Sequence, residues 1–165
     1  MRKSIKKLSF LLLMTAAMVS CKKDGFNGIS DNRPEVPVIV TNAVAFRPDP
    51  AVAASVSAGG AIQSILEIPE SAGRTIKEVT RIALSNSYTR IQGTANLFNT
   101  APIQVNNRTW TFNTSLAEYT ARGGGAIPSI STTAATELTN RFYFLITLDD
   151  GTQVIPMPVR ILVRT

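Results

Sequence analysis

Residues 141–165 read RFYFLITLDDGTQVIPMPVRILVRT. From Phe142 to Leu148, large apolar residues occupy every second position, and the residues between them are mostly apolar as well. Successive side chains of a strand point to opposite faces of its sheet, so this run predicts a central strand that is apolar on both faces. Asp149-Asp150-Gly151 follows with the residue types of a tight turn, and we expect the chain to reverse there.

A second strand is predicted after this turn. Apolar residues at positions 159, 161 and 163 alternate with Arg160 and Arg164, which predicts one apolar face turned inward and one solvated face. The two prolines ahead of the run lack an N–H donor, so we expect strand pairing to be delayed until after them. The two runs together predict a C-terminal β-hairpin.

Upstream, short apolar runs alternate with turn residues. Three of them have the pattern of strands and cover residues 36–46, 62–68 and 88–97. Pro37 interrupts the first run and predicts that it lies at a sheet edge. Residues 121–136 are rich in Gly, Ser, Thr and Ala without a clear period, and they predict a loop.

Residues 75–84 fit two patterns. Thr75 and Glu78 have the spacing of a helix capping box. The β-branched content of the run, with Ile82 and Leu84 in alternation, fits a strand equally well. Of the two, we predict the strand.

Residues 103–112 predict another hairpin. Asn106-Asn107 would close it, because asparagine tolerates the positive φ that such a turn requires. After this turn Trp110 and Phe112 fall on one face of the strand, with threonines on the other.

These runs predict an all-β fold of about seven short strands, arranged as an antiparallel two-layer β-sandwich over residues 38–165. The closing strand pair resembles the last two strands of an immunoglobulin-like or fibronectin type III-like module. The resemblance covers residues 141–165 and implies an immunoglobulin-like sandwich. The cysteine pair of antibody domains is absent, since Cys21 is the single cysteine.

The N-terminal segment has the layout of an export signal. MRKSIKK at 1–7 is positively charged, and LSFLLLMTAAMV at 8–19 is an uncharged, mostly apolar run too short to span a bilayer comfortably. Met18-Val19-Ser20-Cys21 follows, and the segment resembles the leader of Gram-negative bacterial lipoproteins with these four residues at the lipobox. An ordinary signal peptide or a buried N-terminal helix with an incidental cysteine is the alternative.

The resemblance implies that residues 1–20 are a signal peptide that is removed. It also implies that Cys21 carries lipid (palmitate among its chains) and anchors the protein to the outer membrane, where several chains hold firmly. Residues 21–37 then form the lipidated cysteine and a flexible tether rich in Gly, Asp, Asn and Pro. Lys22-Lys23-Asp24 is compatible with either the periplasmic face or the cell surface.

The charge of the chain argues against nucleic acid as a partner. The net charge is +6, but four of the seventeen basic residues and none of the eleven acidic ones lie in the leader. Thirteen basic residues against eleven acidic ones remain in the mature part, about +2. The basicity is therefore mostly a targeting signal.

Residue types limit the chemistry. The chain has no histidine, the commonest general base and transition-metal ligand, and its one cysteine excludes an intrachain disulfide and a cysteine-rich zinc site. Asp149-Asp150-Gly151-Thr152 could contribute to a calcium site, but a hairpin turn uses the same residues. Gly123-Gly124-Gly125 lacks the Lys-Ser/Thr of a phosphate loop. We expect no metal and no cofactor.

One cluster suggests a ligand platform. Trp110, the single tryptophan, with Phe112 and Tyr119 could stack on a sugar ring, and Arg108 could donate hydrogen bonds to it. The alternative, which we favour, is that these aromatic residues fill the sandwich core.

We therefore expect a non-catalytic, lipid-anchored envelope protein with an immunoglobulin-like binding or scaffold domain. Its partners would be the membrane, through the lipid on Cys21, and a glycan or an envelope protein. One alternative is an accessory glycan-binding lipoprotein of an outer-membrane nutrient-uptake system. Another is a small carboxylate-dependent envelope hydrolase, although no acid pair stands out among the carboxylates at 67, 70, 78, 118 and 137.

Overall fold

The computed structural model describes residues 35–130 and 134–165. The predictions for the signal peptide 1–20, for Cys21 and for most of the tether 21–37 lie outside the described residues. Residues 34–165 cluster as one unit. In the described part of the chain, no helix has the length and apolar character needed to cross a membrane.

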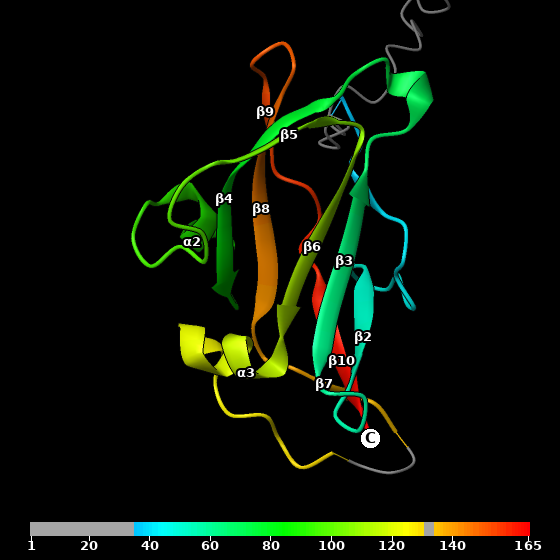
Figure 1. Ribbon diagram of the computed structural model, residues 1–165, viewed down its shortest axis with the longest axis vertical. Helices are drawn as coiled ribbons and strands as arrows, with labels where there is room; N and C mark the ends of the chain where they lie inside the picture. Colours follow the sequence, from blue (N-terminus) through cyan, green and yellow to red (C-terminus); the bar gives the residue numbers. More distant parts are fainter. Residues whose placement is uncertain (1–34, 131–133) are drawn as a thin grey trace, which may run out of the picture. The chain divides into compact units, whose positions relative to one another are not determined.

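Three hydrogen-bonded sheets make up this unit (Figure 1). The first has the order β1 (Ile39–Val40), β3 (Ala61–Glu67), β6 (Thr109–Ser115). The second has the order β2 (Ala51–Ser55), β10 (Arg160–Arg164), β7 (Thr136–Glu137). The third has the order β5 (Ile103–Asn107), β4 (Ile76–Ser85), β8 (Arg141–Leu148), β9 (Gln153–Val154). The helical segments are η1 (Glu70–Ala72), α2 (Thr89–Gln92), α3 (Leu116–Tyr119) and the helical turn η2 (Thr120–Gly124).

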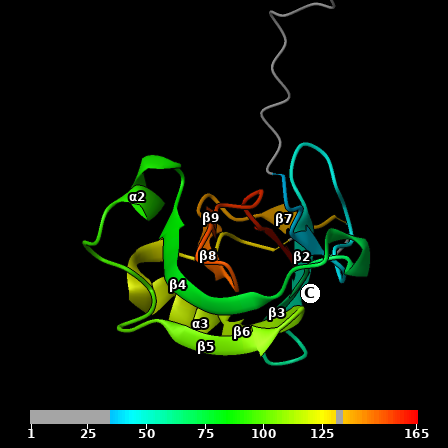
Figure 2. The ribbon, with the colours of Figure 1, turned by 90° about the horizontal axis from the view of Figure 1, so that it is seen from above.

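The sheets pack face to face around an aromatic core, which confirms the predicted all-β sandwich. In Figure 2 the strands β3 and β6 lie on one side of β8. Phe112 of β6 meets Phe142 and Phe144 of β8 with ring centroids 4.9 and 5.5 Å apart, both edge to face. Such pairs add about 0.5–1.5 kcal/mol each beyond the area that they bury.

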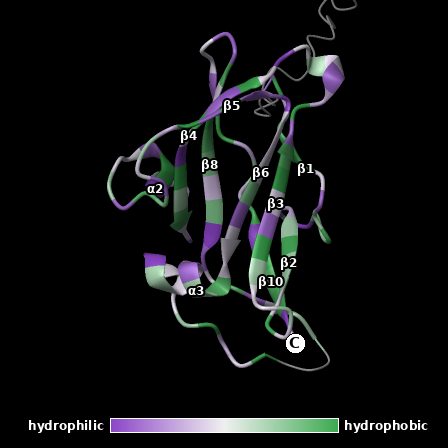
Figure 3. Ribbon diagram, viewed as in Figure 1, coloured by the Kyte–Doolittle hydropathy of each residue, from purple (hydrophilic) through white to green (hydrophobic). Residues whose placement is uncertain are grey.

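β8 is the central strand that its sequence predicts. Every residue from Phe142 to Leu148 is buried. Figure 3 shows hydrophobic residues along β2 and β10, which add Val52, Ala54, Ile161 and Val163 to the same core.

The segment 75–84 is a strand, β4, as predicted. Its pairing with β8 shifts register between Ile76 and Glu78 and between Val79 and Arg81. Each shift inserts an extra residue, so the side chains that β4 buries in the main core are Ile76, Val79 and Ile82, three positions apart instead of two. The bulges therefore explain why the sequence also looked helical.

The predicted C-terminal hairpin is only partly correct. The turn at Asp149–Gly151 forms, with Gly151 at φ 86° and the Leu148 N–H donating to the Thr152 carbonyl at 2.8 Å. The strand that pairs after this turn is the two-residue β9. β10 forms as predicted but leaves β8 after one bridge, Phe142 to Val159, and joins the neighbouring sheet.

In that sheet β10 pairs antiparallel with β7 and parallel with β2, from Ala51 opposite Arg160 to Ser55 opposite Arg164. Neither β2 nor a parallel pair is predicted from the sequence. The small residues of β2 (AVAAS) give a weaker strand signal than the β-branched residues elsewhere.

Arg160 was predicted to be solvated, and that prediction is wrong. Its side chain is 7% exposed. The guanidinium donates to the carbonyls of Arg47 at 2.7 Å and Asp49 at 2.9 Å and to the Glu137 carboxylate at 2.8 Å. Burial is tolerated because each of these acceptors satisfies part of the guanidinium.

The predicted hairpin over 103–112 is wrong as well. β5 pairs with β4 and β6 pairs with β3, so the chain crosses from one layer to the other between these two strands. Asn106 has the expected positive φ, 51°. The crossing lets Val105 and Trp110 approach the core from different sheets, whereas a hairpin would keep both strands in one.

Two other strand predictions need correction. Residues 88–97 form α2 and a loop instead of a strand. The Arg81 guanidinium holds the end of α2 by donating to the carbonyl of Gln92 at 2.9 Å. Of the predicted strand 36–46, only Ile39–Val40 forms, at the edge of its sheet as expected.

Candidate functional site

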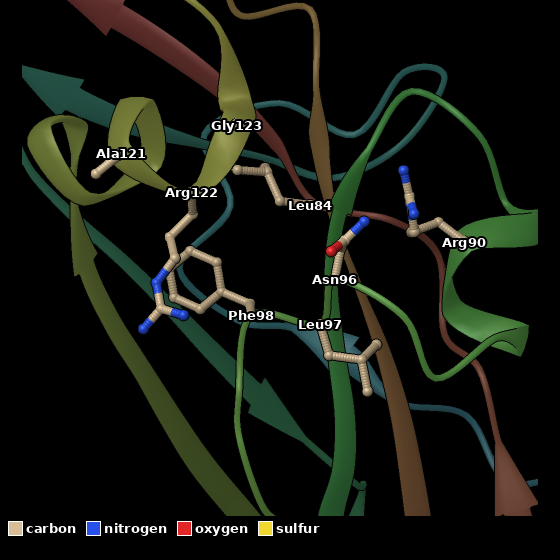
Figure 4. Close-up of a pocket in the computed structure, with 8 residues that line it drawn as sticks. All are labelled: Leu84, Arg90, Asn96, Leu97, Phe98, Ala121, Arg122 and Gly123. Atoms are coloured by element: carbon tan, nitrogen blue, oxygen red, sulfur yellow. The ribbon is translucent and has the colours of Figure 1, made fainter.

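A pocket of about 390 Å³ opens between the loop after β4 and the helical segment α3–η2 (Figure 4). Two arginines, one amide and apolar side chains line it. The lining residues are Leu84, Arg90, Asn96, Leu97, Phe98, Ala121, Arg122 and Gly123.

The loop side of the pocket is fixed to β4. The Ile82 N–H donates to the Asn99 Oδ1 at 2.6 Å, and the Asn99 amide donates to the Thr80 carbonyl at 3.2 Å. The Phe98 N–H donates to the Ile82 carbonyl at 2.7 Å. In α2, Ile91 is fully buried against β4 and β8. Arg90 therefore projects from a supported helical turn.

The helical side is fixed by a cap and by a buried tyrosine. Ser115 Oγ accepts from the Glu118 N–H at 3.1 Å, which starts α3. Tyr119 is 1% exposed, its hydroxyl accepts from the Asn140 N–H at 3.1 Å, and burial raises the pKa of this phenol. The Asn140 amide donates to the Gly124 carbonyl at 3.2 Å, which ties down the end of η2 next to Arg122.

The pocket has a positive charge on two sides. The Arg122 guanidinium lies over the Phe98 ring, 5.3 Å from its centroid. In Figure 4, Arg122 and Arg90 stand on opposite sides of Asn96. No acidic residue lines the pocket, and the nearest carboxylate to Arg122 is Glu118, 3.9 Å from its Nε. The lining offers guanidinium and amide donors and no side chain of the usual nucleophile or general-base types.

No family model, curated protein or solved structure matches this chain. The site is therefore interpreted from its own residues. The two arginines can donate hydrogen bonds to an anionic group in a fixed planar fork.

The pocket was not predicted from the sequence. Its arginines come from segments read as a strand (88–97) and as a loop (121–136). One local signal for its helical side does exist: Ser115 and Glu118 have capping-box spacing.

The aromatic residues of the predicted platform lie together in the core. Phe112 is 5% exposed, and half-buried Trp110 packs on Phe112 and Phe144 at 5.7 and 5.8 Å between centroids. Tyr119 is buried as well. Arg108 does not line the pocket. Its guanidinium is 3.4 Å from the Glu70 carboxylate. Sugar binding by Trp110, Phe112 and Arg108 stays a prediction.

The carboxylates of the acidic turn are paired with an arginine. Arg74 pairs with Asp150 at 2.7 Å and with Asp149 at 3.7 Å. The Thr152 N–H donates to Asp150 at 2.9 Å and lowers the pKa of that carboxyl. Across residues 35–130 and 134–165, no group of three or more His, Cys, Asp or Glu side chains is arranged to hold a metal ion.

Proposed function

We propose that this protein is a non-catalytic binding protein of the bacterial envelope, anchored to the outer membrane by lipid on Cys21. Its β-sandwich holds a ligand in the pocket between Arg90 and Arg122. The observation that carries the binding role is this pocket, with hydrogen-bond donors on two sides, apolar walls and both flanking segments fixed to the core.

The anchor rests on the leader. A basic start, a twelve-residue apolar run and a cysteine directly after Ser20 support lipid attachment. The tether that the sequence predicts for residues 21–37 would let the domain meet a ligand near the membrane.

The accessory glycan-binding role is a narrower form of the same proposal. Arg108, with 42% of its side chain exposed, and half-buried Trp110 are the residues that would meet a sugar there. The hydrolase alternative finds less support, because the candidate acid Glu137 is engaged by Arg160 at 2.8 Å and by Arg141 at 3.6 Å.

Labelling with a radioactive or alkyne-tagged fatty acid tests the anchor. The wild-type protein should take up label and partition into the membrane fraction, and Cys21→Ala should do neither. A labelled Cys21→Ala protein would refute lipid attachment at this residue. Protease treatment of intact cells then distinguishes surface exposure from the periplasmic face.

A further inference from the structure

We propose that the pocket between Arg90 and Arg122 takes a small organic anion, with a carboxylate or sulfate group attached to a ring. This inference rests on the proposed binding function and names the ligand class.

Carboxylates of the described residues leave the positive charge of the pocket largely uncompensated. Arg74, Arg108, Arg141 and Arg160 each have a carboxylate oxygen within 3.4 Å of a guanidinium nitrogen. Among the described residues, Arg90 has no such partner, and Arg122 has only Glu118 at 3.9 Å through Nε. The terminal nitrogens of both pocket arginines are thus available to a ligand, and an anionic group is what they bind best.

Arg122 is held in place before a ligand arrives. Its guanidinium is stacked over Phe98. Phe98 is itself fixed edge to face against Phe112 and Phe142, at 5.6 and 5.4 Å. A side chain that is already ordered loses less conformational entropy when it binds.

The ligand also needs a place for its ring. Leu84, Leu97 and Phe98 supply the apolar part of a lining that is otherwise polar, and one face of a ring can pack on them. Asn96, with φ 53°, presents an amide between the two arginines and can bind a hydroxyl or a second oxygen. A volume of about 390 Å³ is near the lower end for ligand pockets and suits one ring with its substituents.

Two sources share this chemistry: an acidic sugar and a cyclic or aromatic acid. Galacturonate against galactose tests the first, and cyclohexanecarboxylate against cyclohexanecarboxamide tests the second. Binding to the full mature protein in detergent is measured by isothermal titration calorimetry. We expect at least one anion to bind about tenfold or more tightly than its neutral counterpart, and to weaken as salt is raised.

Variants locate the site. Arg90→Gln and Arg122→Gln should each weaken binding of the anion about tenfold, and the double variant should abolish it. Arg122→Lys keeps the charge and should lose less than Arg122→Gln. Arg74→Gln, a surface arginine of the acidic turn, is the matched control and should bind as the wild type does. Circular dichroism checks that each variant is folded.

Each other outcome counts against the proposal. If neutral and anionic probes bind equally well, the pocket binds ligands but does not select anions, so only this inference falls. If no probe binds at about 10 mM, the anion assignment is overturned, while lipid attachment is judged separately by the label on Cys21. Anion binding that survives the double variant would place the site elsewhere.

Discussion

The Arg122 guanidinium lies 5.3 Å from the centre of the Phe98 ring. The two residues come from η2 and from the loop after β4, the two segments that border the pocket. This contact therefore joins the two sides of the site. It also ties the position of a charged donor to the aromatic core beneath it.

Replacing Phe98 by leucine tests this link. Phe98→Leu should lower the free energy of unfolding by about 1–2 kcal/mol and also weaken anion binding, because Arg122 loses its cation–π support. Phe144→Leu is the control, since it removes a core ring that neither lines the pocket nor stacks on Phe98. It should cost stability and leave the affinity of the folded protein unchanged. Equal affinity in both variants would mean that Phe98 does not position Arg122.

Arg160 holds the 47–49 segment and β7 against β10. Arg160→Met keeps much of the apolar stem but leaves the carbonyls of Arg47 and Asp49 and the carboxylate of Glu137 without this donor. We expect a loss of about 2–4 kcal/mol in the free energy of unfolding, measured with urea. Arg164→Met, at an exposed position of the same strand, should change it by no more than about 0.5 kcal/mol. A small effect at Arg160 would argue that water replaces the guanidinium.

Gly124 is in close contact with Tyr119. A Cβ at this position would lie 2.4 Å from the tyrosine ring, and the ring is buried and hydrogen-bonded. Gly124→Ala should therefore lower thermal stability, by about 1–3 kcal/mol at the melting temperature. Gly93→Ala is the matched control, because its Cβ would meet only the Arg90 carbonyl at 3.8 Å. Similar melting temperatures for the two variants would contradict the close packing.

The lowered pKa of Asp150 predicts that the free energy of unfolding depends on pH. The Thr152 N–H lowers the folded-state pKa of Asp150 below the ordinary aspartate value of 3.8. A depressed carboxyl pKa stabilises the fold above the unfolded-state value, and this stabilisation is lost as pH falls through the folded-state value. Wild type should thus be more stable than Asp150→Asn at pH 6, and the difference should shrink below pH 3.8. Urea midpoints at several pH values measure it. A constant difference would assign the effect to packing.

Alternation of residues was enough to predict the layer architecture and the central strand. Phe142 to Leu148 is apolar at almost every position, and such a strand has to be covered on both faces. Alternation could not predict which strand pairs with which. Residues 103–112 look like a hairpin because a turn within one sheet and a crossing between two layers both need a positive φ, here at Asn106.

The pocket was beyond sequence reasoning for a different reason. Arg90 and Arg122 are far apart in the sequence and belong to no shared motif. They come near one another because the side chains of Asn99 and Asn140 hold the two segments in place. The hydrogen bonds of these side chains span 16 to 19 positions of the sequence. Asparagine side chains in loops carry no periodic signal, so long-range pins of this kind show only in three dimensions.

The parallel pairing of β2 with β10 sets an order of events for the growing chain. β2 receives its partner only when residues 160–164 have been made, long after its own synthesis. Until then the edge of β2 that β10 will cover has unpaired N–H and C=O groups, which is the kind of edge that recruits foreign strands. A chain that stops before Arg160 therefore leaves an edge of β2 that can pair with strands of other proteins. The sheet is complete only when residues 160–164 have been made.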